Sequence, residues 1–247
     1  MDIRALDASE VLSNTFLEEY KQGMRLFYFE LVNLNTNVYI MEKINEFPFK
    51  LFCSPTNTIF FSTVIKNLYD VSILTITKLA ADKAGDLSTL LQFKNQVIKS
   101  IKPEYRDELR ELLKQTKFDN GITSMLSIAT AIRNSRIAHL KINDIFNDQI
   151  KRLKIENLKE LAETLNSLLQ ALSFNVEQLL VPLTYSEYAI QNSDIENILD
   201  SIARGSNILN LPETVPTDAW ERQKKRMSLT EIEKLNMYRK KFGLPEA

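Results

Sequence analysis

The chain has 247 residues, a length that suits one large domain or one domain with a modest addition. It carries 31 lysines and arginines against 32 acidic residues, and the formal net charge of −1 gives no support for strong nonspecific nucleic-acid binding. The single cysteine, Cys53, excludes a disulfide framework and a cysteine metal site, and it favours a reducing, cytoplasmic compartment.

Glycine and proline are scarce, with five and seven residues respectively. Sheet proteins with many hairpins need glycine at turns that demand a positive φ, so the scarcity predicts an all-α protein. The N-terminus has acidic residues where a secretory signal would have a basic start. Polar residues interrupt the apolar stretches before the roughly 20 residues of a membrane span, so we expect a soluble protein without membrane contact.

The N-terminal part predicts two long helices. The first covers about residues 8–46, starts at a capping box formed by Asp7 and Glu10, and repeats apolar residues at three-to-four spacing. The asparagine-rich stretch 33–37 predicts a bend or break. After a proline-bracketed connector, residues 56–83 are apolar on nearly every face, which is typical of a helix in the middle of a bundle.

Shorter helices follow, at about 88–101, 103–117, 122–138 and 157–180, with a turn predicted at Asp119-Asn120-Gly121. Pro182 closes the last of them. The remainder predicts short helices, an irregular link around Trp220 and a charged helix, capped by Ser228 and Glu231, that ends near Lys241. We therefore predict a helical bundle over 1–185 and a helical C-terminal extension over 186–247.

His139 is the only histidine, and a lone histidine at a helix end is ordinarily a partly exposed polar residue. Its neighbours favour another interpretation, because Arg133 and Asn134 precede it by six and five residues and Ala138 adjoins it. The run Ala131-Ile132-Arg133-Asn134-Ser135-Arg136-Ile137-Ala138-His139 resembles the signature of the HEPN superfamily, most closely its abortive-infection AbiU-type branch.

The resemblance covers roughly residues 55–185 and implies a bundle of long antiparallel helices. It implies an endoribonuclease that acts as a homodimer, in phage defence or as a toxin. RNA would be its substrate, with cellular tRNA as one example, and an antitoxin or another defence-system protein would be its partner.

The residue types support the same chemistry. RNA cleavage without a metal needs a base for the 2′-hydroxyl, an acid for the leaving 5′ oxygen, and a cation beside the phosphate. Histidine, with an ordinary pKa of about 6.5, can be base or acid. The planar guanidinium of Arg133 presents paired N–H donors that match two phosphate oxygens. Asn134 can hold the phosphate or orient the imidazole.

Helical geometry separates these side chains. Six residues of α-helix turn by about 600°, so Arg133 and His139 point roughly 120° apart with a rise of about 9 Å. One histidine also cannot serve as acid and base at once. Both problems ease when two chains meet around a two-fold axis, so we expect a composite site in a homodimer.

Arg136 and Lys141 are candidate RNA contacts. Arg136 is equally well interpreted as a solvated helix residue, and for Lys141 the solvated interpretation is favoured. The acidic pairs predict solvated faces and no metal site, and no glycine-rich phosphate loop occurs, so no cofactor is expected. The basic clusters 222–226 and 239–241 could bind nucleic acid or a partner protein, but a solvated helix surface is the favoured interpretation. Two alternatives stay open: a non-catalytic HEPN scaffold that binds RNA or a partner, and a toxin–antitoxin subunit that is silenced by modification near the motif.

Overall fold

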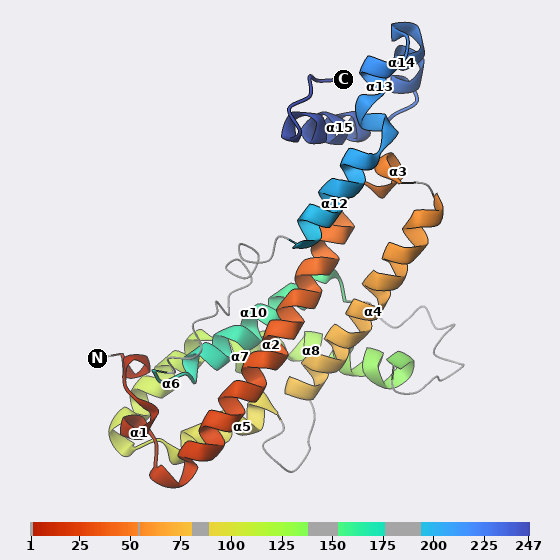
Figure 1. Cartoon of the computed structure of the whole chain (residues 1–247). Coiled ribbons are helices and arrows are strands. Elements are labelled where there is room, and N and C mark those ends of the chain that lie inside the picture. Colours follow the sequence, from red (N-terminus) through yellow and green to blue (C-terminus); the bar gives the residue numbers. More distant parts are fainter. Residues whose placement is uncertain (1, 54, 81–88, 138–152, 176–193) are drawn as a thin grey trace. The chain divides into compact units, whose positions relative to one another are not determined.

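The computed structural model describes residues 2–53, 55–80, 89–137, 153–175 and 194–247. Every regular element within these residues is a helix, which confirms the predicted all-α class (Figure 1). The one β feature among them is an isolated antiparallel bridge between Leu12 and Ile101.

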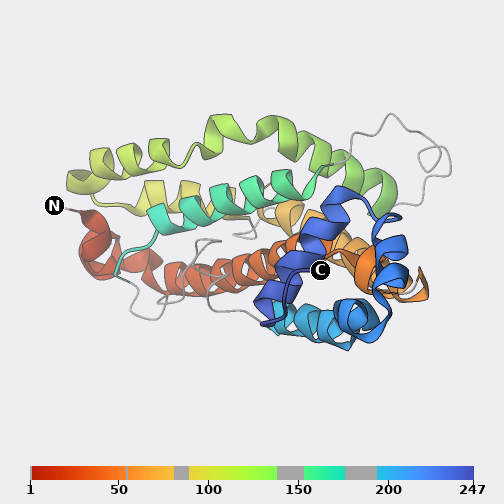
Figure 2. The same cartoon turned by 90° about the horizontal axis from the view of Figure 1, so that it is seen from above.

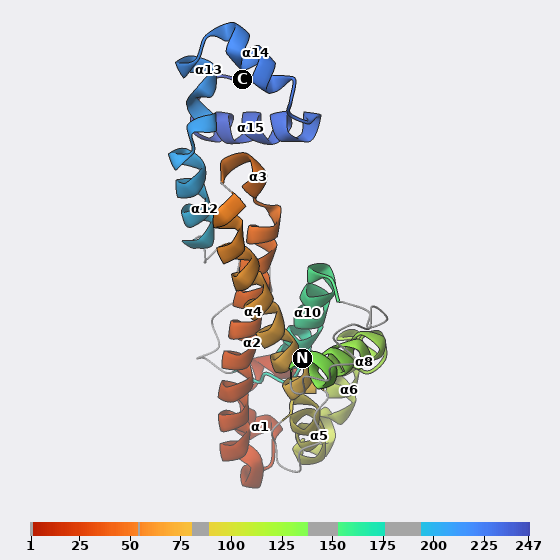
Figure 3. The ribbon, with the colours of Figure 1, turned by 90° about the vertical axis from the view of Figure 1, so that its right-hand side faces the viewer.

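Two long helices, α2 (Leu17–Glu46) and α4 (Pro55–Ala80), dominate the chain, and Figure 3 shows them side by side, joined through α3 (Phe49–Phe52). The other elements, in chain order, are η1 (Ile3–Ala5), α1 (Ala8–Val11), η2 (Asn14–Phe16), α5 (Leu90–Ser100), η3 (Pro103–Tyr105), α6 (Arg106–Gln115), α7 (Phe118–Gly121), α8 (Thr123–Ile132), the π-helical turn η4 (Arg133–Ile137), α10 (Ile155–Ala171), α12 (Asp194–Gly205), η5 (Asn207–Asn210), α13 (Leu211–Thr214), α14 (Thr217–Lys224) and α15 (Leu229–Lys241).

The chain divides into two compact units. The first contains the described residues of 1–41 and 67–191, and the second contains those of 42–66 and 192–247. Residues 42–66, which the sequence analysis groups with the bundle, therefore belong with the C-terminal residues. The predicted division at residue 185 stays a prediction.

In the first unit α5 and α10 both run antiparallel to α2. Ser100, at the end of α5, accepts a backbone hydrogen bond from Ser13, whereas Phe93 lies against Gly23 further along the chain. Figure 2 shows α10 between α2 on one side and α6 and α7 on the other. Long antiparallel helices are thus present, although this alone does not identify a HEPN bundle.

The predicted break at residues 33–37 is wrong, because α2 continues through the asparagine-rich stretch. Asn35 is fully buried and exchanges two hydrogen bonds with the side chain of Asn166 in α10, at 3.3 and 3.0 Å. A buried amide with its polar atoms paired is tolerated inside a helix, whereas sequence alone shows only a polar residue with weak helix propensity.

The prediction that the second long helix is buried on nearly every face is also wrong. Only 22% of the most apolar stretch of α4 is buried, and its exposed side chains include Ile59, Phe60, Val71 and Leu74. The apolar composition therefore indicates an uncovered surface along much of this helix and not a central position in a core.

Three other boundaries differ from the predictions. The first helix is interrupted at Leu12 and Ser13, where the bridge to α5 takes over the backbone hydrogen bonds. The turn predicted at 119–121 is part of the single-turn helix α7. The helix predicted to reach residue 180 ends at Ala171, because the backbone that follows bonds to other parts of the unit.

The second unit has its own apolar core. Trp220, predicted to lie in an irregular link, is buried in α14 and belongs to a cluster that draws on α3, α12 and α15. The buried members of this cluster are Phe47, Phe52, Leu199, Ala203, Leu209, Trp220 and Leu235.

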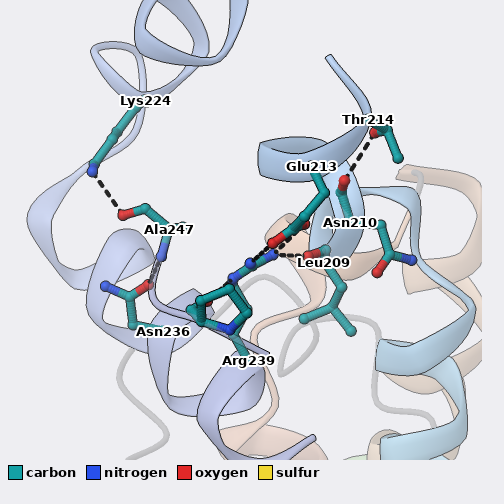
Figure 4. Close-up of polar contacts among 9 residues, drawn as sticks. Leu209, Asn210, Glu213, Thr214, Lys224, Asn236, Arg239 and Ala247 are labelled. Carbon is teal, nitrogen blue, oxygen red and sulfur yellow. Dashed lines mark hydrogen bonds and ion pairs between the residues drawn. The ribbon is translucent and has the colours of Figure 1, made fainter. Parts of the chain in front are cut away.

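A fully buried arginine links the segments of the second unit (Figure 4). The guanidinium of Arg239 in α15 donates to the carbonyl of Leu209, to the carbonyl of Pro245 at 2.6 Å and to both carboxylate oxygens of Glu213. A buried cation is retained only when its donors are paired, and here the partners come from η5, α13 and the C-terminal residues.

The crossing of α2 and α5 predicts a steric requirement for glycine. A Cβ atom at Gly23 would lie 2.5 Å from Cε2 of the buried Phe93 ring. We expect Gly23→Ala to destabilise the first unit by about 1–3 kcal/mol through overpacking, measured by urea unfolding with far-UV circular dichroism. The matched control is Gly121→Ala, whose Cβ meets only the Lys117 Cβ at 3.4 Å. Equal unfolding midpoints for the two variants would contradict the close approach.

The Glu213–Arg239 pair predicts a pH dependence in the second unit. The hydrogen bonds from Arg239 lower the pKa of Glu213 below its usual 4.5, so the pair stabilises the fold above that pH and loses its effect as pH falls through the folded-state pKa. We expect Glu213→Gln to unfold earlier than wild type at about pH 7, and the difference to shrink as pH falls below 4.5 and through the lowered folded-state pKa. Trp220, the only tryptophan, reports the transition by fluorescence. A difference that stays constant with pH would refute the role of this carboxylate.

Candidate functional site

The motif identified in the sequence begins where α8 changes its hydrogen-bonding pattern. Residues Arg133–Ile137 form a single π-helical turn that directly follows Ile132, the last residue of α8. π turns are rare, and they occur frequently at functional sites because they change the direction of side chains within a helix. The turn coincides with the Arg–Asn pair that the sequence analysis selected.

The side chains of Arg133 and Asn134 contact each other. Nε of Arg133 donates to Oδ1 of Asn134 at 3.2 Å, with Arg133 half-buried and Asn134 exposed. A hydrogen bond at Nε restricts the rotation of the guanidinium, so its planar fork is held in one orientation. Asn134 is therefore placed to orient the arginine. Its predicted role of orienting the imidazole involves His139, which lies outside the described residues.

The buried face of the helix fixes the position of this pair. Ala129, Ile132 and Ser135 are buried, and the Ser135 hydroxyl donates to the carbonyl of Ala131 at 2.8 Å. Ala131 and Asn134 are exposed, so they lie on the opposite face from this anchor. Of the other predicted core positions, Met125, Ile128 and Ile137 are half-buried.

The structure brings together only part of the predicted constellation. His139 and Lys141 lie outside the described residues. Arg136 lies in the π turn between Arg133 and Ile137, and for this residue only the backbone is described. The described part of the candidate site therefore consists of Arg133, Asn134 and the helix that carries them.

The described residues include no group of three histidine, cysteine, aspartate or glutamate side chains that could hold a metal ion. A shallow, open hollow of about 450 Å³ lies on α12, lined by Asn197, Ile198, Ser201 and Ile202. It belongs to the second unit, and its lining offers no acid, base or cation, so it does not resemble a catalytic site.

The second basic cluster is only partly a solvated surface, so that prediction needs correction. Arg239 is fully buried, and Lys241 forms an ion pair with Asp200 at 2.7 Å. The signal was present in the sequence, because Arg239 lies four residues after the buried Leu235 and so shares its helix face.

Comparison of the chain with family models, curated proteins and solved structures finds no match. By length and composition alone, Thr58–Ala80 of α4 is long and apolar enough to cross a membrane, contrary to the expectation from the sequence that no stretch meets this criterion. One such helix is weak grounds for a membrane assignment.

Proposed function

We propose that the chain is a cytosolic, metal-independent endoribonuclease of the HEPN type, acting as a toxin or an abortive-infection effector. The observation that carries the proposal is the π turn at Arg133–Ile137, in which Asn134 bonds the guanidinium of Arg133 six residues before His139, the only histidine in the sequence. The biological role comes from the family resemblance of this motif.

In the proposed reaction the 2′-hydroxyl of a ribose attacks the adjacent phosphorus, and the bond to the 5′ oxygen breaks. A neutral imidazole takes the proton of the hydroxyl, and a protonated imidazole gives one to the leaving oxygen. Arg133 stabilises the charge on the phosphate oxygens. The products are a 2′,3′-cyclic phosphate and a 5′-hydroxyl.

This scheme needs two imidazoles, and the chain has one histidine. We therefore propose that two copies of the chain combine their His139 and Arg133 side chains in one composite site. Arg136 and Lys141 are proposed as additional contacts to the RNA backbone, for which a local cation is enough despite the net charge of −1.

The proposal predicts cleavage of RNA in EDTA by the purified wild-type protein. We expect His139→Ala and Arg133→Ala each to reduce the cleavage rate by about 100-fold to 10,000-fold, because each removes a group needed in the transition state. The measurement is the rate of fragment formation on a panel of RNAs that includes tRNA, with the 3′ ends analysed for a cyclic phosphate.

The matched control is Arg110→Ala, since Arg110 is an exposed arginine on α6 with an ion pair to Asp107. It should cleave at the wild-type rate. Full activity of His139→Ala would refute the mechanism. Binding of RNA without cleavage of any RNA on the panel would instead favour the non-catalytic HEPN scaffold.

The contact between Asn134 and Arg133 predicts an intermediate effect. We expect Asn134→Ala to lower the rate about 10-fold to 100-fold, because the guanidinium keeps its charge and loses its fixed orientation. Asn134→Asp retains the acceptor but places a negative charge beside the arginine, so it should lower RNA affinity as well. An Asn134→Ala variant as defective as Arg133→Ala would indicate a direct role for the amide.

A further inference from the structure

Exposed side chains along α4 form a stripe at helical spacing. Phe60, Thr63, Asn67, Val71 and Leu74 follow one another at intervals of three or four residues and are all exposed, which places them on one face of the helix. Phe60 is 65% exposed, Val71 48% and Leu74 40%. Exposed apolar side chains gathered in this way are typical of an interaction surface.

The stripe is symmetric about Asn67. Phe60 and Leu74 lie seven residues to either side of it, and Thr63 and Val71 lie four residues to either side. The Thr63 hydroxyl donates to the carbonyl of Ile59 at 2.9 Å, so this side chain satisfies its polar group within the helix and offers its methyl group outward. When such a helix packs antiparallel to a copy of itself, Phe60 meets Leu74 and Thr63 meets Val71.

Charge follows the same symmetry. Lys66 and Asp70 are four residues apart on one flank of the stripe. When the two-fold axis is perpendicular to the helix near Asn67, the same flank of both helices lies on the same side of the dimer. Lys66 of each helix then lies beside Asp70 of the other helix, which gives two symmetry-related pairs of opposite charge. At the axis the two Asn67 amides meet, and amides can bond reciprocally, as Asn35 and Asn166 do within one chain.

These polar residues also argue against lipid as the occupant. Lys66, Asn67 and Asp70 lie near the middle of α4, and a charged residue at the centre of a membrane span costs about 2.5–3.5 kcal/mol on insertion scales. A polypeptide surface that places opposite charges beside Lys66 and Asp70 can pair with these polar side chains.

We infer that α4 packs antiparallel against α4 of a second copy of this chain, with Asn67 at the two-fold axis. The exposed surface continues onto α2 at the far end of the stripe. Lys78 there forms an ion pair with Glu30 at 2.6 Å, and the exposed Leu26 lies one turn before Glu30. The inference uses no residue of the motif, but it shares with the ribonuclease proposal the requirement that two copies of the chain associate.

The test measures the mass of the full-length protein by sedimentation equilibrium. Wild type should be a dimer, and Leu74→Glu should raise the dimer dissociation constant by at least about 100-fold with unchanged helix content by circular dichroism. The matched control is Leu91→Glu on α5, because Leu91 is similarly exposed, at 37%, and lies outside the stripe. This control should remain a dimer.

Cross-linking tests the register. In a Cys53→Ser background, Asn67→Cys should form an intermolecular disulfide on mild oxidation, whereas Ser62→Cys, an exposed position on another face of α4, should not. A monomeric wild type, equal cross-linking at both positions, dissociation by Leu91→Glu, or a monomer that floats with anionic phospholipid vesicles would each overturn the inference. RNA cleavage is read separately. A monomeric wild type would also contradict the composite ribonuclease site, whereas equal cross-linking or dissociation by Leu91→Glu would overturn only the α4 interface.

Discussion

The first unit depends on the hydroxyl of Tyr20, which joins the start of α2 to the residues after α10. It donates to the carbonyl of Leu172 at 2.9 Å and accepts from the backbone N–H of Phe174 at 3.0 Å. The ring stacks between Phe93 and Phe174, and burial raises the pKa of the phenol. One side chain thus fills the core and satisfies two backbone groups that the end of α10 leaves without helical partners.

This contact explains why periodicity misplaced the end of α10. The apolar pattern runs on past Ala171, but the backbone of Leu172 and Phe174 bonds to Tyr20, and the N–H of Asn175 donates to the carbonyl of Arg4. These partners lie more than 150 residues away in sequence, so no local pattern contains them. Tertiary hydrogen bonds outweighed helix propensity, which is worth less than about 1 kcal/mol per residue.

The sequence predicted what depends on local chemistry. The all-α class and the capping boxes at Asp7 and Ser228 follow from neighbours within one helical turn, and the structure confirms both. The sequence could not predict which side chains of α4 are buried or that the Asn35 amide is paired. The apolar or polar character of a residue does not say which segment of the chain packs against it. For the candidate site, the sequence selected Arg133 and Asn134 but not the π turn, since no residue type specifies that hydrogen-bonding pattern.

The π turn also changes the argument for a two-chain site. The estimate that Arg133 and His139 point roughly 120° apart assumed 100° per residue, the value for an α-helix. A π turn closes its hydrogen bonds over one more residue, so each residue contributes a smaller rotation and the estimate no longer applies from Arg133 onward. The need for a second copy then rests only on the two proton transfers of the reaction. One imidazole cannot be base and acid in the same step, and the chain supplies one histidine.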